Sequence, residues 1–249
     1  MTQTKSQNTV IVRHNGSITW LHLNRPDRLN AVNGAVIEEL IDGLVAACDR
    51  GADLVVFAGE GRAFSAGFDL SGLDQQSDAD LLYRFVRVEQ LLQMIYQLPM
   101  TSVALVQGRC FGAAADIVAS CRKRIATPDA SFRMPGLQFG IVLGTRRLAR
   151  LIGDDAAFDL LEASRVFDAD DALEMGFLTD IQPAENWASH IDRLAIDAGN
   201  LGGDAKTALL AATRDGRGLD HDLAALVRSA AKPGLADRMR AFVATQVKK

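Results

Sequence analysis

Residues 101–120, TSVALVQGRCFGAAADIVAS, decide the fold class of this chain. The first part of the stretch, TSVALVQG (101–108), is a short apolar run of the kind that forms a buried strand. The second part, GAAADIVAS (112–120), consists largely of small residues and predicts a short helix. A buried strand that gives way at once to a helix is typical of layered α/β proteins, in which helices cover a largely buried sheet.

The segments nearest the N-terminus predict a hairpin. TVIVR (9–13) and SITWLHL (17–23) are strand-like runs, and the second alternates apolar and polar residues. Between them stand Asn15 and Gly16, a pair that favours a tight hairpin turn. The chain is therefore expected to begin with two antiparallel strands.

Helix and strand then alternate up to the opening stretch. NGAVIEELIDGLVAACDR (33–50) has apolar residues at helical spacing, with Asn33 as the expected N-cap. LVVFAG (54–59) predicts another buried strand. Residues 78–98 predict a longer helix with one apolar stripe, which Pro99 ends.

On the C-terminal side the pattern becomes helical. RIAT (124–127) and SFRM (131–134) are weak strand candidates. From residue 145 onward the chain is mostly helical, with one short strand candidate at FLTDI (177–181). NLGGDAKT (200–207) predicts a turn rather than a domain linker.

Composition places the chain among ordinary globular proteins. Of its 249 residues 48% are hydrophobic and 23% charged, which argues against long disorder and coiled coils. The formal net charge of -4 gives no basic field for nucleic acid, although a local basic pocket stays open. The cysteines lack zinc-site spacing and predict a reducing, cytoplasmic setting. They are Cys48, Cys110 and Cys121.

Other functional classes find little support. The start, MTQTKSQN, is too polar for a secretory signal, and residues 101–119 are too polar to span a bilayer. GEGRAF (59–64) lacks the third glycine of a dinucleotide fingerprint, and no Gly-x-Ser-x-Gly elbow surrounds Ser65. A solvated or subunit-contact face is the favoured reading of one basic cluster. Its members are Arg146, Arg147 and Arg150.

Two loops of small residues carry the chemical signal. AFSAGFDL (63–70) and GRCFGAAADIVASC (108–121) each follow a predicted strand. Small side chains let a ligand approach the backbone, and N–H groups at a helix start have no partner within the helix. Two such N–H groups that converge on one point form an oxyanion hole. The alternative, that both loops are only tight packing corners, stays open from these residues alone.

The chain resembles the crotonase superfamily, also called the enoyl-CoA hydratase/isomerase family. The resemblance extends from about residue 9 to about residue 245, and its motifs keep the family's order and spacing. The matching segments are HLNRPDRLNAVNGAVIEEL (22–40), FSAGFDL (64–70), GRCFGAAADIVASC (108–121), MPGLQFGIVLGTRRLARLIG (134–153) and SRVFDADDALEMGFL (164–178).

The resemblance implies an α/β fold with a crotonase-like spiral ββα core and a helical C-terminal trimerisation region. The expected divisions are a flexible N-terminus at 1–8, the core at 9–195 and the helical region at 196–249. The implied substrate is an acyl-CoA thioester, with no cofactor beyond the coenzyme A of the substrate itself. The implied assembly is a homotrimer or a dimer of trimers. The apolar positions of the last helix suit burial on another subunit or on the chain's own core. They are Leu235, Met239, Phe242 and Val243.

The resemblance also assigns site residues. The oxyanion donors would be the backbone N–H groups of Phe68 and Ala113, the latter at a position where the family more often has glycine. Asp116 stands where family hydratases carry the first of two glutamates, on the same helical face as Ala113. Its alternative role is that of an acidic residue favoured by the helix dipole. The positions that match the family's CoA path are Arg25, Pro26, Arg28, Ala31, Ala66, Phe68, Asp69 and Leu70. The two arginines suit phosphate contact, unless they are ordinary surface residues.

Two departures from the family pattern bear on the reaction. The second glutamate position is Gly136, which cannot transfer a proton, and the segment between Gly140 and Arg147 is about three residues short. One carboxylate can shuttle a proton between carbons, whereas hydration uses both an acid and a base. We therefore predict isomerase-like or related enolate chemistry on the thioester, with Asp116 as the acid/base, in fatty acid metabolism. The alternatives are an enoyl-CoA hydratase, which is a lyase, and a non-catalytic acyl-CoA-binding or assembly subunit.

Overall fold

The computed structural model describes residues 8–214 and 216–246, and this part of the chain forms two sheets. The larger sheet has the order β1 (Val10–Asn15), β2 (Ile18–Leu23), β3 (Leu54–Gly59), β4 (Thr101–Val106), β6 (Lys123–Ala126), β9 (Asp180–Ile181). The smaller sheet has the order β5 (Arg109–Phe111), β7 (Ser131–Arg133), β8 (Phe167–Asp168). Of the N-terminus that we expect to be flexible, residues 1–7 lie outside the described residues.

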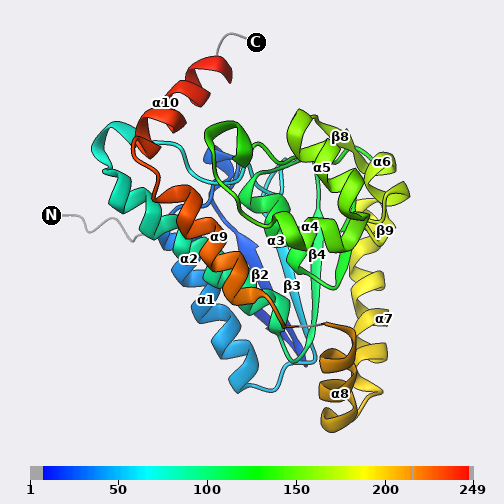
Figure 1. Cartoon of the computed structure of the whole chain (residues 1–249). Coiled ribbons are helices and arrows are strands. Elements are labelled where there is room, and N and C mark those ends of the chain that lie inside the picture. The colour runs from blue at the N-terminus through cyan, green and yellow to red at the C-terminus, as the bar shows by residue number, and fades with distance from the viewer. Residues whose placement is uncertain (1–7, 215, 247–249) are drawn as a thin grey trace, which may run out of the picture.

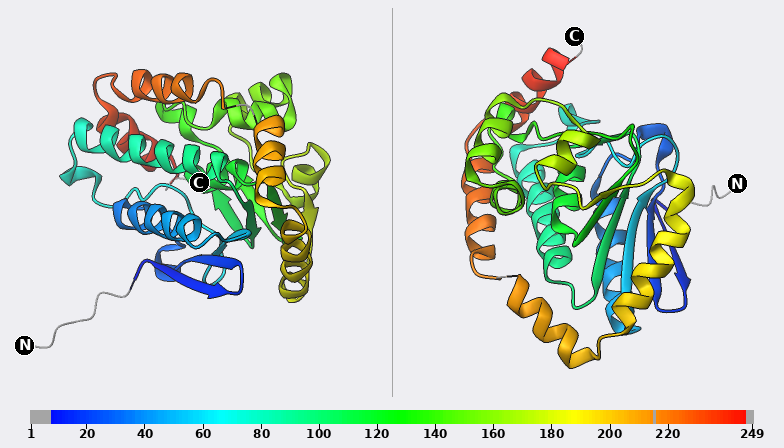
Figure 2. Two further views of the ribbon diagram at one scale, coloured as in Figure 1. Left: turned by 90° about the horizontal axis from the view of Figure 1, so that it is seen from below. Right: turned by 90° about the vertical axis from the view of Figure 1, so that its right-hand side faces the viewer.

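Helices cover the larger sheet on both faces (Figure 1). Figure 2 shows α7 on one face and α2 on the other, with α9 outside α2. The α-helices of the described part are α1 (Gly34–Asp49), α2 (Asp78–Gln97), α3 (Ala113–Ser120), α4 (Thr145–Ile152), α5 (Asp154–Ala163), α6 (Ala169–Glu174), α7 (Trp187–Gly199), α8 (Gly203–Thr213), α9 (Leu219–Ala230) and α10 (Leu235–Gln246). The short 3-10 helices are η1 (Pro26–Arg28), η2 (Leu73–Gln75), η3 (Gly136–Phe139) and η4 (Ala184–Asn186).

Strand β3 shows how the sheet is buried on both faces. Val55 and Phe57 pack in the apolar cluster to which α1 and α2 contribute. Leu54, Val56 and Ala58 pack in a second cluster, to which α7 contributes. Successive side chains of a strand point to opposite faces, so an uninterrupted apolar run fits a strand with a helix layer on each side.

The order of parallel strands brings the two small-residue loops together. β1 and β2 form the predicted antiparallel hairpin, with Asn15 opposite Ile18. β2, β3, β4 and β6 are parallel neighbours. Because parallel strands end at the same edge of a sheet, the loops that follow β3 and β4 start side by side.

The predicted strands at 54–59 and 101–108 and the predicted helices at 33–50 and 78–98 are confirmed, within one or two residues at their ends. The Asn33 side chain accepts a hydrogen bond from the Val36 N–H at 3.0 Å, as expected of an N-cap. Sequence patterns missed β5 and β8, because strands of three and two residues are too short to show a period.

Two predictions on the C-terminal side need correction. The strand candidate at 177–181 contributes only its last two residues, as β9. The turn predicted at 200–207 is wrong from Gly203 onward, because α8 begins there. The pair Gly202 and Gly203 therefore lies at the start of a helix, with Gly202 as its N-cap, and not in the middle of a turn.

Helix α10 packs on the chain's own core. Leu235 and Met239 are fully buried, and they share an apolar cluster with Phe85 and Phe139. Phe242 and Val243 pack against the same cluster while staying partly exposed. Burial on the chain's own core is therefore confirmed for Leu235 and Met239, while burial of Phe242 and Val243 on another subunit stays a prediction.

The predicted boundary between 9–195 and 196–249 stays a prediction, and it falls inside α7. None of the described helices is both long enough and apolar enough to cross a membrane.

Candidate active site

The loop after β3 and the segment after β4 are joined by their backbones. The Ser65 N–H donates to the carbonyl of Arg109, and the Ser65 carbonyl accepts the N–H of Phe111, both at 3.1 Å. The Ser65 hydroxyl donates to the carbonyl of Asn30 at 2.7 Å and accepts the N–H of Gly67 at 3.1 Å. Ser65 is fully buried, so it holds the crossing of the two segments rather than facing a ligand.

Gly67 sits where the two segments approach most closely. Its φ is +87°, and a Cβ at this position would lie 2.1 Å from the carbonyl oxygen of Phe111. The same Cβ position is 3.3 Å from the backbone nitrogen of Ala113. Only glycine fits such a contact at this φ, and the contact places Phe68 beside the start of α3.

The N–H groups of Phe68 and Ala113 have no acceptor among the described residues. The neighbours of Phe68 are both engaged with Val32, since the Gly67 carbonyl accepts from Val32 and the Asp69 N–H donates to Val32. Phe68 is the middle residue of this parallel bridge, so its N–H points away from Val32. Ala113 is the first residue of α3, so its N–H has no partner within the helix.

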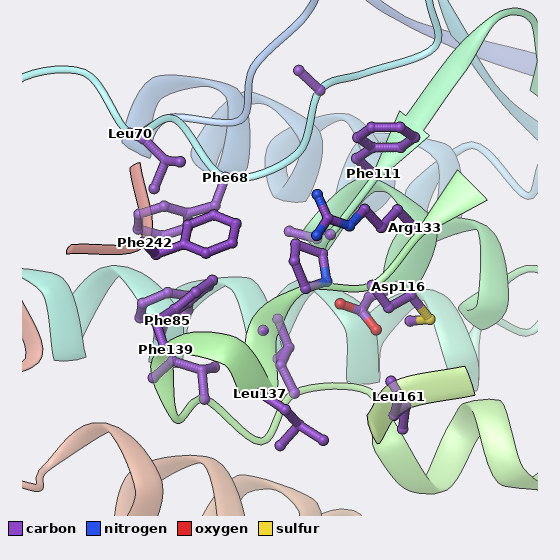
Figure 3. A pocket seen from close by; sticks show the side chains of 18 of the residues that line it. Phe68, Leu70, Phe85, Phe111, Asp116, Arg133, Leu137, Phe139, Leu161 and Phe242 are labelled. Atoms are coloured by element: carbon purple, nitrogen blue, oxygen red, sulfur yellow. The ribbon is translucent and has the colours of Figure 1, made fainter. Parts of the chain in front are cut away.

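Phe68 and Ala113 line one cavity of about 410 Å³. Its walls are mostly apolar, and Figure 3 shows aromatic side chains grouped along one side. The rings of Phe68 and Phe85 stack with centroids 4.3 Å apart, and those of Phe139 and Phe242 lie 5.1 Å apart. The cavity is of the size and character of small-ligand sites.

Asp116 is the one carboxylate among the described residues that line this cavity. It is 4% exposed, and its Oδ1 has no hydrogen-bond partner in the described part of the chain. Gly144 lies against it, because a Cβ at Gly144 would be 1.8 Å from the Asp116 Oδ1. Burial raises the pKa of Asp116 well above its usual value, while the charge of Arg147 opposes this shift and that of Glu89 adds to it.

A buried ion pair supplies the charges that act on Asp116. The guanidinium of Arg147 donates to both carboxylate oxygens of Glu89, at 3.0 and 2.5 Å, and both side chains are almost completely buried. Asp222 lies 3.5 Å from Arg147 and accepts two hydrogen bonds from Arg146. The predicted solvated or subunit-contact face is therefore wrong for Arg147, because this side chain is buried and paired with Glu89.

Gly136 also lines the cavity, at the start of η3. Its φ is not positive, and the nearest atom to an added Cβ is the carbonyl oxygen of Ile141 at 3.2 Å. The position that the resemblance associates with a second acid therefore borders the cavity and carries no side chain.

The residues expected along the CoA path fall into two groups. Ala66, Phe68 and Leu70 line the cavity. Pro26, Arg28 and Ala31 do not line it, and Arg28 is largely exposed.

Arg25 and Asp69, also expected on the CoA path, pair with each other at 2.8 Å, and Arg25 also donates to the carbonyl of Ala31. Burial alone would raise the pKa of Asp69, but hydrogen bonds from Ser71 and Arg25 hold it below its usual value. In the described structure Arg25 therefore holds the loop together.

Sequence reasoning missed three arginines that contact the site. One of them, Arg109 of β5, lines the cavity with its guanidinium 5.1 Å from the centre of the Phe111 ring. Arg84 of α2 lies 4.0 Å from the centre of the Phe68 ring and donates to the Asp69 carbonyl at 2.9 Å. Arg133, at the end of β7, lines the cavity. No local pattern marks Arg84 or Arg133, because only the packing of α2 and β7 brings them to the loops.

The family model described as enoyl-CoA hydratase/isomerase matches residues 13–212. The chain belongs to this family.

Among relatives of this enoyl-CoA hydratase/isomerase family member, a protein of Mycobacterium tuberculosis named "Probable enoyl-CoA hydratase echA6" is 33% identical over 185 residues. That match covers 72% of this chain and 74% of the relative. An ethylmalonyl-CoA decarboxylase of Bos taurus is 30% identical over 182 residues, covering 70% of this chain and 58% of the relative.

A solved structure from Bordetella parapertussis, described as a candidate enoyl-CoA hydratase/isomerase, superposes with a TM-score of 0.94. It is 43% identical to this family member and covers 96% of this chain and 99% of its own. The crotonase-like fold class expected from the sequence is therefore confirmed, and its α/β core and C-terminal helices match those of solved relatives.

Proposed function

We propose that the protein binds an acyl-CoA thioester and stabilises its enolate with the N–H groups of Phe68 and Ala113, while Asp116 moves the proton. The observation that carries the proposal is the cavity itself. Two backbone N–H groups without acceptors and one buried carboxylate, in the described part of the chain, border the same apolar space. The reaction that fits this set best is an isomerase-like shift of a proton between carbons.

Each part of the site has a distinct task in this reaction. Asp116 removes a proton from a carbon activated by the thioester, and the electron pair moves to the carbonyl oxygen. The two N–H groups donate to that oxygen, and each such donor contributes about 2.7–4 kcal/mol to transition-state stabilisation. Asp116 then returns the proton to another carbon, so one carboxylate suffices for both transfers.

A hydratase is the first alternative, and it is favoured by the relative whose name is "Probable enoyl-CoA hydratase echA6". Hydration adds water across a double bond and is served well by an acid and a base together. Gly136 has no side chain that could act as the second acid or base, so we rank hydration below isomerisation. The second alternative is a non-catalytic acyl-CoA-binding or assembly subunit.

Several associated properties belong to the same proposal. Coenzyme A is part of the substrate, and we expect no separate cofactor. Arg28, Pro26 and Ala31 are proposed to contact CoA outside the cavity. A homotrimer or dimer of trimers in the cytoplasm is the expected form, and light scattering that reports a monomer near 27 kDa would contradict the assembly.

Exchange of α-protons tests the proposed function without knowledge of the product. The protein is incubated with a panel of acyl-CoAs in D₂O, and deuterium uptake is read by mass spectrometry. We expect uptake with the native protein and a loss of about 10²–10⁴-fold in Asp116→Asn, the usual contribution of a general acid/base. Asp116→Asn should still bind CoA ligands. A native protein that binds acyl-CoAs and exchanges none of them would support the binding-subunit alternative.

A further inference from the structure

Arg133 is one of two arginines that line this mostly apolar cavity, and the other, Arg109, lies 5.1 Å from the centre of the Phe111 ring. Arg133 belongs to β7, and its carbonyl accepts the N–H of Gly112 at 2.7 Å, so its backbone lies beside the start of α3. Figure 3 shows the Arg133 side chain reaching into the cavity between Phe111 and Asp116. Any acyl group held at Phe68 and Ala113 therefore lies within the neighbourhood of this guanidinium.

The guanidinium of Arg133 has only neutral acceptors among the described residues. Its Nε donates to the carbonyl of Ser164 at 2.9 Å, and its two terminal nitrogens donate to Gln246 and Gln138 at 2.8 and 3.2 Å. Gln246 and Gln138 are exposed, so their amides can turn away at little cost. A guanidinium has five N–H groups, so two donors remain even with these three bonds in place.

Two other arginines near the site are paired with carboxylates. Arg25 pairs with Asp69, Arg147 with Glu89, and each pair joins two elements of the fold. Asp116 lies in the same cavity as Arg133, but the two side chains form no ion pair in the described structure. The positive charge of Arg133 is thus left for a group that enters the cavity.

The loss of the second acid strengthens this argument. Gly136 stands three residues after Arg133 and borders the same cavity, at the position where the resemblance implies a glutamate. With a glycine there, no carboxylate at this position competes for the guanidinium. The fork of N–H groups matches the two oxygens of a carboxylate, and such bidentate pairs are among the stronger hydrogen bonds in proteins.

We propose that Arg133 binds a carboxylate carried by the acyl group, so that the substrate is a mono-CoA thioester of a dicarboxylic acid. This inference rests on the proposed function. The carboxylate is an anchor and stays on the product. Pairing with a guanidinium stabilises the carboxylate anion in the bound substrate, which opposes its departure as CO₂. Arg133 therefore favours proton transfer on a carboxylated acyl group over decarboxylation.

Matched ligands test the proposal by titration calorimetry. Glutaryl-CoA and pentanoyl-CoA have five-carbon acyl chains and differ in a terminal carboxylate. We expect the native protein to prefer glutaryl-CoA by about 10-fold to 100-fold, as for a hydrogen-bonded charged group. Arg133→Gln should bring the ratio close to one, and Arg133→Lys should restore part of it. Arg193→Gln, which removes an exposed charge from α7, should keep the native ratio.

The phosphates of CoA are the other anions that Arg133 could bind, and a second pair of ligands separates them. The glutaryl and pentanoyl thioesters of pantetheine lack the phosphates, and our proposal expects the same preference between them. If Arg133→Gln weakens both CoA thioesters equally and neither pantetheine thioester, the guanidinium binds a phosphate and the proposal is wrong.

Deuterium exchange on the same ligands keeps the two proposals apart. Exchange on pentanoyl-CoA with no preference for glutaryl-CoA in binding would overturn the role of Arg133 and leave the enolate chemistry standing. A preference for glutaryl-CoA that depends on Arg133, without exchange on any thioester, would support the carboxylate site and contradict the proposed enzyme.

Discussion

Gly67 and Gly136 shape two walls of the cavity, and they differ in how much space they leave for a side chain. On the backbone wall, formed by residues 66–68 and 111–113, a Cβ at Gly67 would lie 2.1 Å from the Phe111 carbonyl oxygen. On the acid wall, formed by Asp116, Gly136 and Ile141, the nearest atom to a Cβ at Gly136 is 3.2 Å away.

The backbone wall is built of main chain, so its geometry depends on Gly67 and leaves little freedom to change. The acid wall is built of side chains, so residues there can change without altering the fold. Under the proposed function, the backbone wall supplies the two oxyanion donors. Under the same proposal, the acid wall supplies the proton-transferring group and so decides which reaction follows.

The largest expected effect is on the acid wall. Asp116→Asn should lower the rate of α-proton exchange by about 10²–10⁴-fold, because the amide cannot take up the proton. The raised pKa of Asp116 gives the native protein a further signature. Exchange should rise with pH up to a value well above that of an ordinary carboxyl group, since the base must first lose its proton. A native rate that is flat between pH 5 and pH 8 would argue against Asp116 as the base.

The next effect tests the backbone wall. Gly67→Ala should lower exchange by about 10²–10³-fold, the usual effect of losing one oxyanion donor, because the added methyl group forces Phe68 away from Ala113. It should also lower the melting temperature, since the clash lies in buried backbone. Gly202→Ala is the matched control, because nothing lies within 4 Å of a Cβ there. Native-like exchange in Gly67→Ala would show that the two segments are looser than the contact implies.

A smaller effect concerns stability on the acid wall. The pKa of Asp116 is higher in the folded than in the unfolded chain, so ionisation favours unfolding. Its contribution to stability is full below about pH 3.9 and declines by about 1.4 kcal/mol per pH unit up to the folded-state pKa. Asparagine does not ionise, so Asp116→Asn lacks this pH-dependent loss of stability. Its free energy of unfolding should therefore rise relative to that of the native protein as pH rises.

Urea unfolding between pH 5 and pH 8 measures this difference. Asp159→Asn on the exposed face of α5 serves as the control, and its difference from the native protein should stay constant. A constant difference for Asp116→Asn as well would mean that Asp116 is already ionised in the folded protein across this range, so that its pKa is not raised as its burial indicates.

The smallest effect is a gain of function at Gly136. Gly136→Glu should introduce or raise hydration of crotonyl-CoA, because the backbone accepts a Cβ if Ile141 shifts by a few tenths of an ångström. Gly136→Gln, of the same size but without an acid, should not show the gain. Native activity on crotonyl-CoA is the sharper measurement. A kcat/KM of about 10⁴–10⁸ M⁻¹s⁻¹ would show that hydration needs no acid at this position.

Local sequence patterns predicted the parts of the fold in which local interactions dominate. The turn at Gly16 and the cap at Asn33 each depend on neighbours within a few residues, and both were predicted. The burial of Arg147 was not, because its partner Glu89 lies 58 residues away and on another helix. The place of Arg133 in the cavity depends on the pairing of β7, which the sequence offered as a candidate strand, with β5, which is too short to show a pattern.

The same limit applies to the candidate site. The resemblance led to Phe68, Ala113 and Asp116, and the structure brings all three to one cavity. It also led to Arg25 as a phosphate contact, which stays a prediction, and the structure shows that the Nη1 of this side chain is held by Asp69 and the Ala31 carbonyl. A residue type at a matching position indicates what a side chain can do, and only its neighbours decide whether it is available to do it.

The contact between Gly144 and Asp116 links two positions that lie far apart in the chain. A Cβ at Gly144 would be 1.8 Å from the Asp116 Oδ1, so neither position can take a larger side chain while the other stays as it is. We therefore expect the shorter acid and the shorter segment before Arg147 to compensate each other. In homologues we expect residues 116 and 144 to covary, and a lineage that restores glutamate at 116 should also lengthen the segment that contains 144.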